Sequence, residues 1–228
     1  MPPLEELFAG LVNKNPKPKK VNILGEHFPL FAEDFDWKEN ARVFSALQQL
    51  DKSSAEEAWP LLNKHLADAG YCLSVNRAEQ VDIASFTNIS VHELCWDVAR
   101  RDLTYVLRIT PPEPNRRNRL QFDEWENNWR PVLRFRNKEW WDQNRGKKLY
   151  ELQIELLEWL ITEAPGPATL SEEDRKVLVS KARAEIDDLR KARQGKVAES
   201  RFTDRHRSIF DKKAADRIRE RYQRFGSD

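Results

Sequence analysis

The chain has 228 residues, of which 39% are hydrophobic and 34% charged, with a formal net charge of +1. It is more polar than an average globular chain, although its 8 Trp, 11 Phe and 4 Tyr argue against disorder throughout. Two cysteines cannot supply a disulfide framework or a four-ligand zinc site, and no segment reaches the ~20 apolar residues of a membrane span. We therefore expect a soluble, cytoplasmic protein with no metal, no cofactor and no membrane association.

Charges are segregated along the sequence. Residues 33–102 and 149–189 carry an excess of Asp and Glu, whereas residues 111–148 and 190–228 carry an excess of Lys and Arg. The basic C-terminal segment could bind an external anion, or it could fold back on the acidic body of its own chain. Composition leaves both arrangements open.

Helical patterns dominate the first third of the chain. Residues 4–13 predict a short amphipathic helix, and the proline-containing basic segment that follows cannot continue it, so we expect an N-terminal arm. Apolar residues at helical spacing predict a helix over residues 37–50. A third helix is predicted to begin after Ser54, which forms a capping-box pattern with Glu57, and to end near Gly70.

Short β-prone runs follow. Residues 71–75 and 81–86 favour strands, and a helix capped by Ser90 is predicted over residues 91–102. Residues 103–109 are rich in β-branched and aromatic side chains and are the best strand candidate, with residues 132–136 as a hairpin partner.

The C-terminal half is predicted to be helical. Leucines at intervals of three and four residues indicate a core helix over residues 140–161, and the Pro-Gly-Pro sequence at 165–167 marks a boundary. A charged helix is expected to begin after Ser171, and a last helix is predicted over residues 203–225.

These elements predict an α+β fold that is predominantly helical, with a compact core of two to four short strands followed by two charged C-terminal helices. We divide the chain into an N-terminal helix and basic linker at 1–20, an α+β core at 21–164 and a charged helical extension at 165–228.

Motifs of catalysis are missing from the sequence. No glycine-rich phosphate loop is present, and no Ser-His-Asp order or nucleophile elbow is visible. His92 and Cys95 share a helix face but supply only two metal ligands, and Cys95 has acidic neighbours, so a buried inert thiol is expected. We favour a protein that is not an enzyme, while a site assembled in space from distant residues stays open.

The basic tail is the first candidate binding surface. Its cations are Arg201, Arg205, Arg207, Lys212, Lys213, Arg217, Arg219, Arg221 and Arg224. Cations on free helices neutralise phosphates and release counterions, which predicts salt-dependent binding to DNA or RNA. The alternative is that Phe210, Ile218, Tyr222 and Phe225 dock on the body while the cations form ion pairs or stay solvated.

A second basic segment interleaves cations with aromatic side chains. Arg116, Arg117 and Arg119 lead into a stretch that also contains Arg130, Arg134, Arg136, Trp125, Trp129, Trp140 and Trp141. Single-strand binding surfaces combine these residue types. Packing of the tryptophans in the core is the alternative.

We therefore predict a non-catalytic intracellular protein that associates with nucleic acid through its basic C-terminal helices. One alternative is a protein-interaction subunit of a larger assembly, or a self-associating protein, whose apolar stripes at 179–189 and 210–225 bury against a partner. A second alternative is an enzyme whose site is not legible in the sequence.

Overall fold

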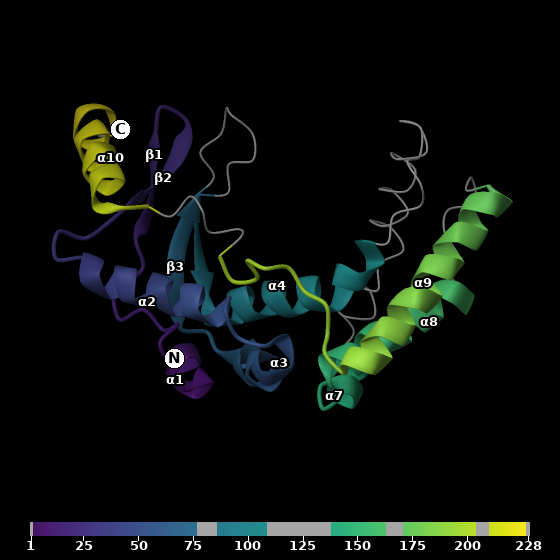
Figure 1. Cartoon of the computed structure of the whole chain (residues 1–228). Coiled ribbons are helices and arrows are strands. Elements are labelled where there is room, and N and C mark those ends of the chain that lie inside the picture. Colours follow the sequence, from purple (N-terminus) through teal and green to yellow (C-terminus); the bar gives the residue numbers. More distant parts are fainter. Residues whose placement is uncertain (1, 77–85, 109–137, 163–170, 204–209, 227–228) are drawn as a thin grey trace. The chain divides into compact units, whose positions relative to one another are not determined.

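A computed structural model of the chain describes residues 2–76, 86–108, 138–162, 171–203 and 210–226 (Figure 1). Helices account for 62% of these residues, and four short strands form two antiparallel hairpins. The predicted fold class, a predominantly helical α+β fold with two charged helices at its C-terminal end, is confirmed. None of the described helices is long and apolar enough to cross a membrane.

The chain forms two compact units, each built from segments that are distant in the sequence. Unit 1 comprises Met1–Ser53, Lys64–Val98 and Glu199–Asp228, and unit 2 comprises Ser54–Asn63 and Ala99–Ala198. Unit 1 therefore includes both ends of the chain. The three-part linear division stays a prediction, because compact units are not the same as domains.

Unit 1 holds both hairpins. Its described elements are α1 (Leu4–Ala9), β1 (Lys19–Ile23), β2 (Glu26–Leu30), α2 (Trp37–Leu50), a short 3-10 helix (His65–Ala67), β3 (Tyr71–Asn76), β4 (Phe86–Ser90), the first part of α4 (Val91–Thr104) and α10 (Lys212–Phe225). In the first hairpin Lys19 pairs with Leu30, and in the second Tyr71 pairs with Ser90. Helix α4 begins with the predicted capping box, since Ser90 Oγ accepts from Glu93 N and Glu93 Oε2 accepts from Ser90 N.

Helix α1 is packed into unit 1, so the expected N-terminal arm is wrong. Leu7, Phe8 and Leu11 are buried. Phe8 stacks on His65 with ring centroids 5.4 Å apart. Arg42 of α2 donates to the carbonyl oxygens of Gly10 and Val12, at 2.8 and 2.9 Å, and thereby ties down the chain after α1. The helix ends at Ala9, with Gly10 at its C-cap, rather than at residue 13 as predicted, and its apolar face makes it part of the core.

Unit 2 is mainly helical. Its described elements are α3 (Ala55–Lys64, with Lys64 in unit 1), the last part of α4, a 3-10 helix (Tyr105–Arg108), α7 (Lys138–Asn144), α8 (Leu149–Thr162) and α9 (Glu172–Ala192). Helices α8 and α9 pack together, and Leu178, Ala182, Ile186 and Leu189 of α9 are buried. The Ser171 hydroxyl caps α9 by accepting from Asp174 N, as predicted.

Polar groups that are half-buried or buried join distant segments of unit 2. The Glu56 carboxylate accepts hydrogen bonds from the backbone amides of Leu149, Tyr150 and Gly195. Gln153 is fully buried; its amide nitrogen donates to the Asp102 and Lys196 carbonyls, and its amide oxygen accepts from Lys196 N. These contacts hold the chain that follows α9 against α8.

Three predicted elements need correction. The predicted strand at 103–109 is wrong, because α4 continues to Thr104 and a 3-10 helix follows, burying Val106 and Leu107. The predicted helix at 140–161 is two helices, because a turn at Gly146 interrupts it and Glu56 caps α8 from a distant segment. The last helix begins at Lys212 rather than at residue 203, since the Asp211 side chain caps it by accepting from Ala214 N at 2.7 Å.

Other predicted features lie outside the described residues. These are most of the run at 81–86, the last residue of the strand candidate at 103–109, its partner at 132–136 and the Pro-Gly-Pro boundary at 165–167.

Candidate nucleic-acid interface

Helix α10 has an apolar and a basic face. Six of its residues are Lys or Arg and two are acidic. At 3.6 residues per turn, Ala215, Ile218 and Tyr222 share one face, and Lys213, Arg217 and Arg224 lie on the opposite face. The first set is buried or half-buried and the second is exposed, so the burial follows the sequence pattern.

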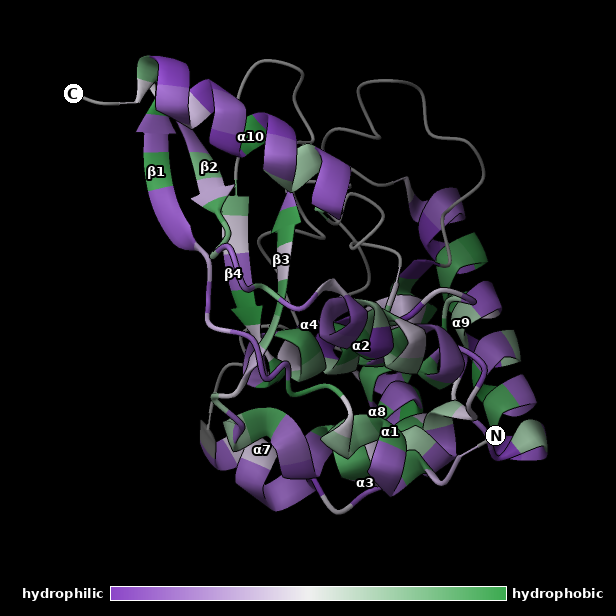
Figure 2. Cartoon of the chain, turned by 90° about the vertical axis from the view of Figure 1, so that its left-hand side faces the viewer, coloured by the Kyte–Doolittle hydropathy of each residue, from purple (hydrophilic) through white to green (hydrophobic). Residues whose placement is uncertain are grey.

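The apolar face of α10 docks on the β1–β2 hairpin of unit 1 (Figures 1 and 2). Ala215 joins Phe31 and Phe35 in a buried cluster, against which Trp37 and Phe210 pack. The ring centroids of Phe31 and Phe210 are 6.1 Å apart. Docking of the tail on its own chain, the predicted alternative, is therefore the arrangement found, although Phe225 at the end of α10 is 53% exposed.

Two arginines of α10 make contacts that hold the helix on unit 1. Arg219 Nη2 donates to the carbonyl oxygens of Phe31 and Ala32, at 3.0 and 3.2 Å. The guanidinium of Arg221 lies over the ring of Phe28, 5.3 Å from its centroid, and 3.9 Å from the Glu26 carboxylate. Arg219 satisfies backbone groups at the end of β2, and Arg221 is partly engaged while still exposed.

Arg201 requires a correction, because it is not on the surface. Its relative exposure is 2%, and its guanidinium lies 5.3 Å from the ring centroid of Phe202. A side chain buried to this degree cannot reach a phosphate without rearrangement. Sequence could not show this, since burial of an arginine depends on which segments surround it.

Several predicted contacts lie outside the described residues. These are Arg205, Arg207, Arg116, Arg117 and Arg119, together with Trp125, Trp129, Arg130, Arg134 and Arg136. Of the tryptophans assigned to the second basic segment, Trp141 is buried and packs edge-on against Trp59, with ring centroids 6.0 Å apart. For Trp141, core packing is the role that the structure shows.

The outer face of α10 carries cations that are not used in the fold. Lys213, Arg217 and Arg224 on this face are exposed, and so is Lys212, which begins the helix about 100° around its axis from Lys213; within the described part of the chain none of the four side chains makes a hydrogen bond or an ion pair. Lys213 and Arg224 are eleven residues apart, which at about 1.5 Å per residue spans roughly 16 Å. Figure 2 shows that this outward side of α10 is mostly hydrophilic. We call these four residues the α10 basic face.

Unit 1 has two further exposed cations, Lys19 and Lys20 of β1, which the sequence prediction did not include among the binding residues. The signal for them was present, because both residues close the basic segment after α1. The packing of α10 on β1 and β2 joins distant segments of the chain, which local patterns do not reveal.

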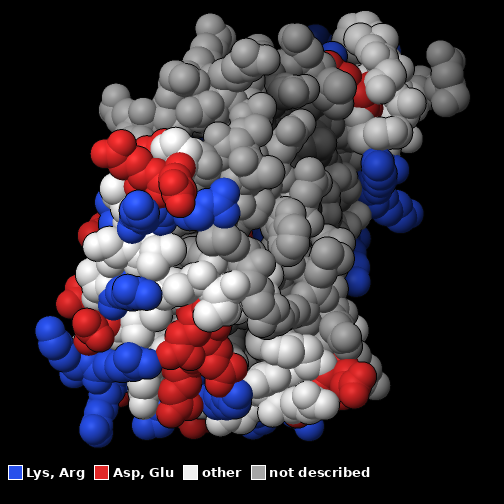
Figure 3. All heavy atoms as spheres, turned by 90° about the vertical axis from the view of Figure 1, so that its right-hand side faces the viewer, with Lys and Arg blue, Asp and Glu red and all other residues white. Residues whose placement is uncertain are grey.

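Helix α9 of unit 2 has a different charge pattern. Arg190 pairs with Glu158 at 2.8 Å, and Lys196 lies 2.8 Å from Glu185. In Figure 3, acidic and basic side chains alternate over the described part of the face that it shows. Neighbouring charges of opposite sign weaken the attraction for a polyanion.

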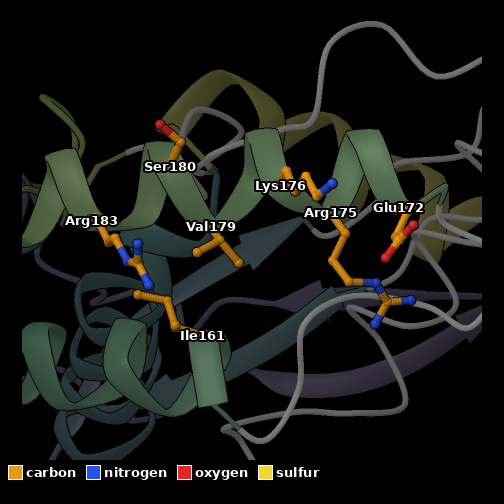
Figure 4. Close-up of a pocket in the computed structure, with 7 residues that line it drawn as sticks. All are labelled: Ile161, Glu172, Arg175, Lys176, Val179, Ser180 and Arg183. Carbon is orange, nitrogen blue, oxygen red and sulfur yellow. The ribbon is translucent and has the colours of Figure 1, made fainter.

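An open hollow of about 590 Å³ lies between the end of α8 and the first turns of α9 in unit 2 (Figure 4). Ile161 of α8 and Val179 of α9 point toward one another, and Arg175, Arg183 and Glu172 lie around them. Its lining has mixed charge. We assign it no role in binding.

The two thiols are buried in unit 1. Burial raises the pKa of Cys95 to about 12 and raises that of Cys72 as well, so both thiols are neutral near pH 7. A neutral thiol is a poor nucleophile and a poor metal ligand. No group of three or more His, Cys, Asp or Glu side chains that could hold a metal ion occurs among the described residues.

No family model matches this chain, and neither does any curated protein or solved structure. The assignment of a site therefore depends on geometry and charge alone. Among the predicted contacts that are described, the structure brings Lys213, Arg217 and Arg224 together on one exposed face, with Lys212 exposed at the start of the helix and Arg221 beside them, and it uses Arg201 and Arg219 inside unit 1.

Proposed function

We propose that this protein is a non-catalytic nucleic-acid-binding protein whose α10 basic face contacts the phosphate backbone of DNA or RNA. The observation that carries the proposal is that one face of α10 packs on unit 1 and the opposite face is exposed and basic. Its apolar face and Arg219 fix the helix on the β1–β2 hairpin, while three cations on the other side and Lys212 at the start of the helix have no described partner.

The geometry of the α10 basic face suits a polyanion. Its length of roughly 16 Å matches about five phosphates of one strand, at about 3.4 Å per phosphate along the axis. Because the helix is already docked, the backbone that carries its cations is fixed before binding, and less backbone conformational entropy is lost than with a free tail. Contacts of this kind bind nucleic acid with little preference for sequence.

The protein-interaction alternative is less well supported, because most of the two predicted apolar stripes is already covered. Ala182, Ile186 and Leu189 of the first predicted stripe are buried within unit 2, and the apolar face of α10 is covered by the hairpin of unit 1. A partner would therefore have to bind elsewhere. This alternative, like that of an enzyme, stays a prediction.

The test is a fluorescence-anisotropy titration of labelled single-stranded and duplex DNA and RNA at about 50 mM salt. We compare the wild-type protein with the triple variant K213Q/R217Q/R224Q, in which glutamine keeps the helix propensity while removing the charge. We expect the triple variant to bind at least about tenfold more weakly, because three phosphate contacts are lost.

A matched control removes three exposed cations from α9. The variant K176Q/R183Q/K191Q has the same change in net charge, and its positions are exposed like those on α10. We expect it to bind nearly as well as the wild type. Equal weakening by both variants would show that net charge rather than the α10 basic face governs binding, and no binding by the wild type would overturn the proposal.

A further inference from the structure

A hollow of about 360 Å³ adjoins the start of α10 in unit 1. It is lined by Trp37, Asn40, Ala41 and Phe44 of α2 and by Phe210, Asp211 and Lys212. The three aromatic side chains are half-buried, so each is packed on one side and accessible on another. This volume lies within the range of about 300–1,000 Å³ that is usual for small-ligand sites.

The aromatic walls of the hollow are held by the core beneath them. Phe31 contacts Trp37 and Phe210, with ring centroids 5.0 and 6.1 Å away. Phe35 lies 4.8 Å from Trp37, and Phe86 lies 6.1 Å from Phe210. Rings fixed in this way lose little freedom when a flat ligand stacks on them.

The lining includes one buried polar side chain, that of Asn40. Asn40 is 9% exposed, and its side-chain oxygen accepts from the Asn13 amide at 3.3 Å. Its amide nitrogen donates to no other residue in the described part of the chain. This nitrogen is not among the buried side-chain atoms without a partner in the described part of the chain, so solvent reaches it, and it is free to donate to a ligand carbonyl that enters the hollow.

The hollow is continuous with the α10 basic face. Lys212 belongs to both, and Lys213 is the next residue of the helix. The Asp211 carboxylate accepts from Ala214 N, so its charge lies against the positive end of the α10 dipole. An aromatic hollow beside a row of cations is the combination that binds single strands, in which bases stack while phosphates meet Lys and Arg.

We propose that the hollow between α2 and the start of α10 binds an unpaired nucleobase of a single-stranded nucleic acid, which stacks on the rings of Trp37, Phe44 and Phe210. The Asn40 amide donates to a carbonyl of the base, and Lys212 contacts its phosphate. This inference rests on the proposed function and adds a preference for single strands over duplex, because paired bases cannot enter the hollow.

The test compares two labelled strands of about 12 nucleotides, oligothymidine and an abasic strand with the same phosphates. The wild-type protein is expected to bind oligothymidine about 5- to 150-fold more tightly than the abasic strand, since stacking is lost with the base. In Phe44→Ala this ratio should fall toward one, whereas Phe44→Tyr, which keeps the aromatic ring, should retain it.

A second variant distinguishes loss of the base site from loss of the fold. Ala41 is exposed on α2 and lines the hollow, so Ala41→Gln fills the space without removing a packed side chain. We expect it to lower the ratio as Phe44→Ala does, with unchanged thermal unfolding. Equal binding of the two strands by the wild type, with the effect of K213Q/R217Q/R224Q intact, would overturn the base site and leave the proposed function standing; a wild type that binds neither strand would overturn both.

Discussion

Arg217 and Arg219 are two residues apart in α10 and have different surroundings. Arg219 donates two hydrogen bonds to backbone carbonyls of unit 1, whereas Arg217 is exposed and part of the α10 basic face. A count of charged residues in the sequence treats the two arginines alike. Sequence predicted that these arginines are candidates for binding but could not separate them, because the separation depends on what lies opposite each side chain.

This difference gives a paired prediction for stability. Arg219→Gln should lower the free energy of unfolding by about 1–2 kcal/mol, because charge-assisted hydrogen bonds to two carbonyls are lost. Arg217→Gln should change it by less than about 0.5 kcal/mol and weaken nucleic-acid binding instead. Urea unfolding followed by tryptophan fluorescence measures the first quantity, and equal destabilisation by the two variants would contradict the placement of Arg219.

Glu39 makes stability dependent on pH. Its carboxylate accepts from Arg42 at 2.8 Å and from Lys14 N at 3.0 Å, and the side-chain hydrogen bond from Arg42 is the main reason that the pKa of Glu39 is lowered to about 2. A lowered pKa means that the ionised form stabilises the folded state. This stabilisation is complete above the ordinary pKa of about 4.5 and is lost as the pH falls toward 2.

Glu39→Gln should therefore be less stable than the wild type by about 1–2 kcal/mol at pH 7. The difference should shrink as the pH falls below about 4.5 and be mostly lost near pH 2, where about half of the wild-type carboxylates in the folded protein are protonated. Urea midpoints at a series of pH values measure it. A difference that stays constant from pH 7 to pH 2 would show that the ion pair is not its cause.

At the scale of elements, patterns that depend on near neighbours were predicted well. The bounds of α2 agree with the prediction, and Ser90 and Ser171 cap their helices through the residues expected. The failures involve distant partners. Residues 103–108 have β-prone side chains but complete a helical segment, and Glu56 begins α8 from almost a hundred residues away. Burial and capping by remote groups override local propensity in both cases.

The chain after α9 packs closely against α8 at Gly195. We therefore expect a side chain at this position to destabilise the fold. A Cβ at Gly195 would lie 2.7 Å from two side-chain carbons of the buried Leu149, and 3.1 Å from Gln153 Oε1. Gly195→Ala should destabilise the protein by about 1–3 kcal/mol, because a filled core must move. Thermal unfolding checks this change.

Gly146 supplies the matched control. A Cβ at this glycine would meet no atom within 4 Å, and its backbone φ is not in the left-handed region. Gly146→Ala should therefore be neutral or slightly stabilising, because alanine reduces the freedom of the unfolded chain. Similar losses in both variants would contradict the close approach at Gly195.

At the scale of the whole molecule, the segregation of charge seen in the sequence is only partly neutralised within the fold. Arg190 and Lys196 pair with carboxylates in unit 2, and Arg219 is used within unit 1, but the α10 basic face has no described partner. Composition pointed to a basic C-terminal segment and left open whether it was docked or free. The structure combines the two, with the helix docked and one face of its cations exposed.

The most direct test of this account is the salt dependence of binding to single-stranded DNA. Four phosphate contacts predict that the logarithm of the binding constant falls with the logarithm of salt concentration with a slope of about −2.8, at about 0.7 per contact. K213Q/R217Q/R224Q should reduce the slope to about −0.7, while K176Q/R183Q/K191Q should leave it near the wild-type value. An equal slope in the wild type and the α10 variant would contradict the claim that this face binds phosphates.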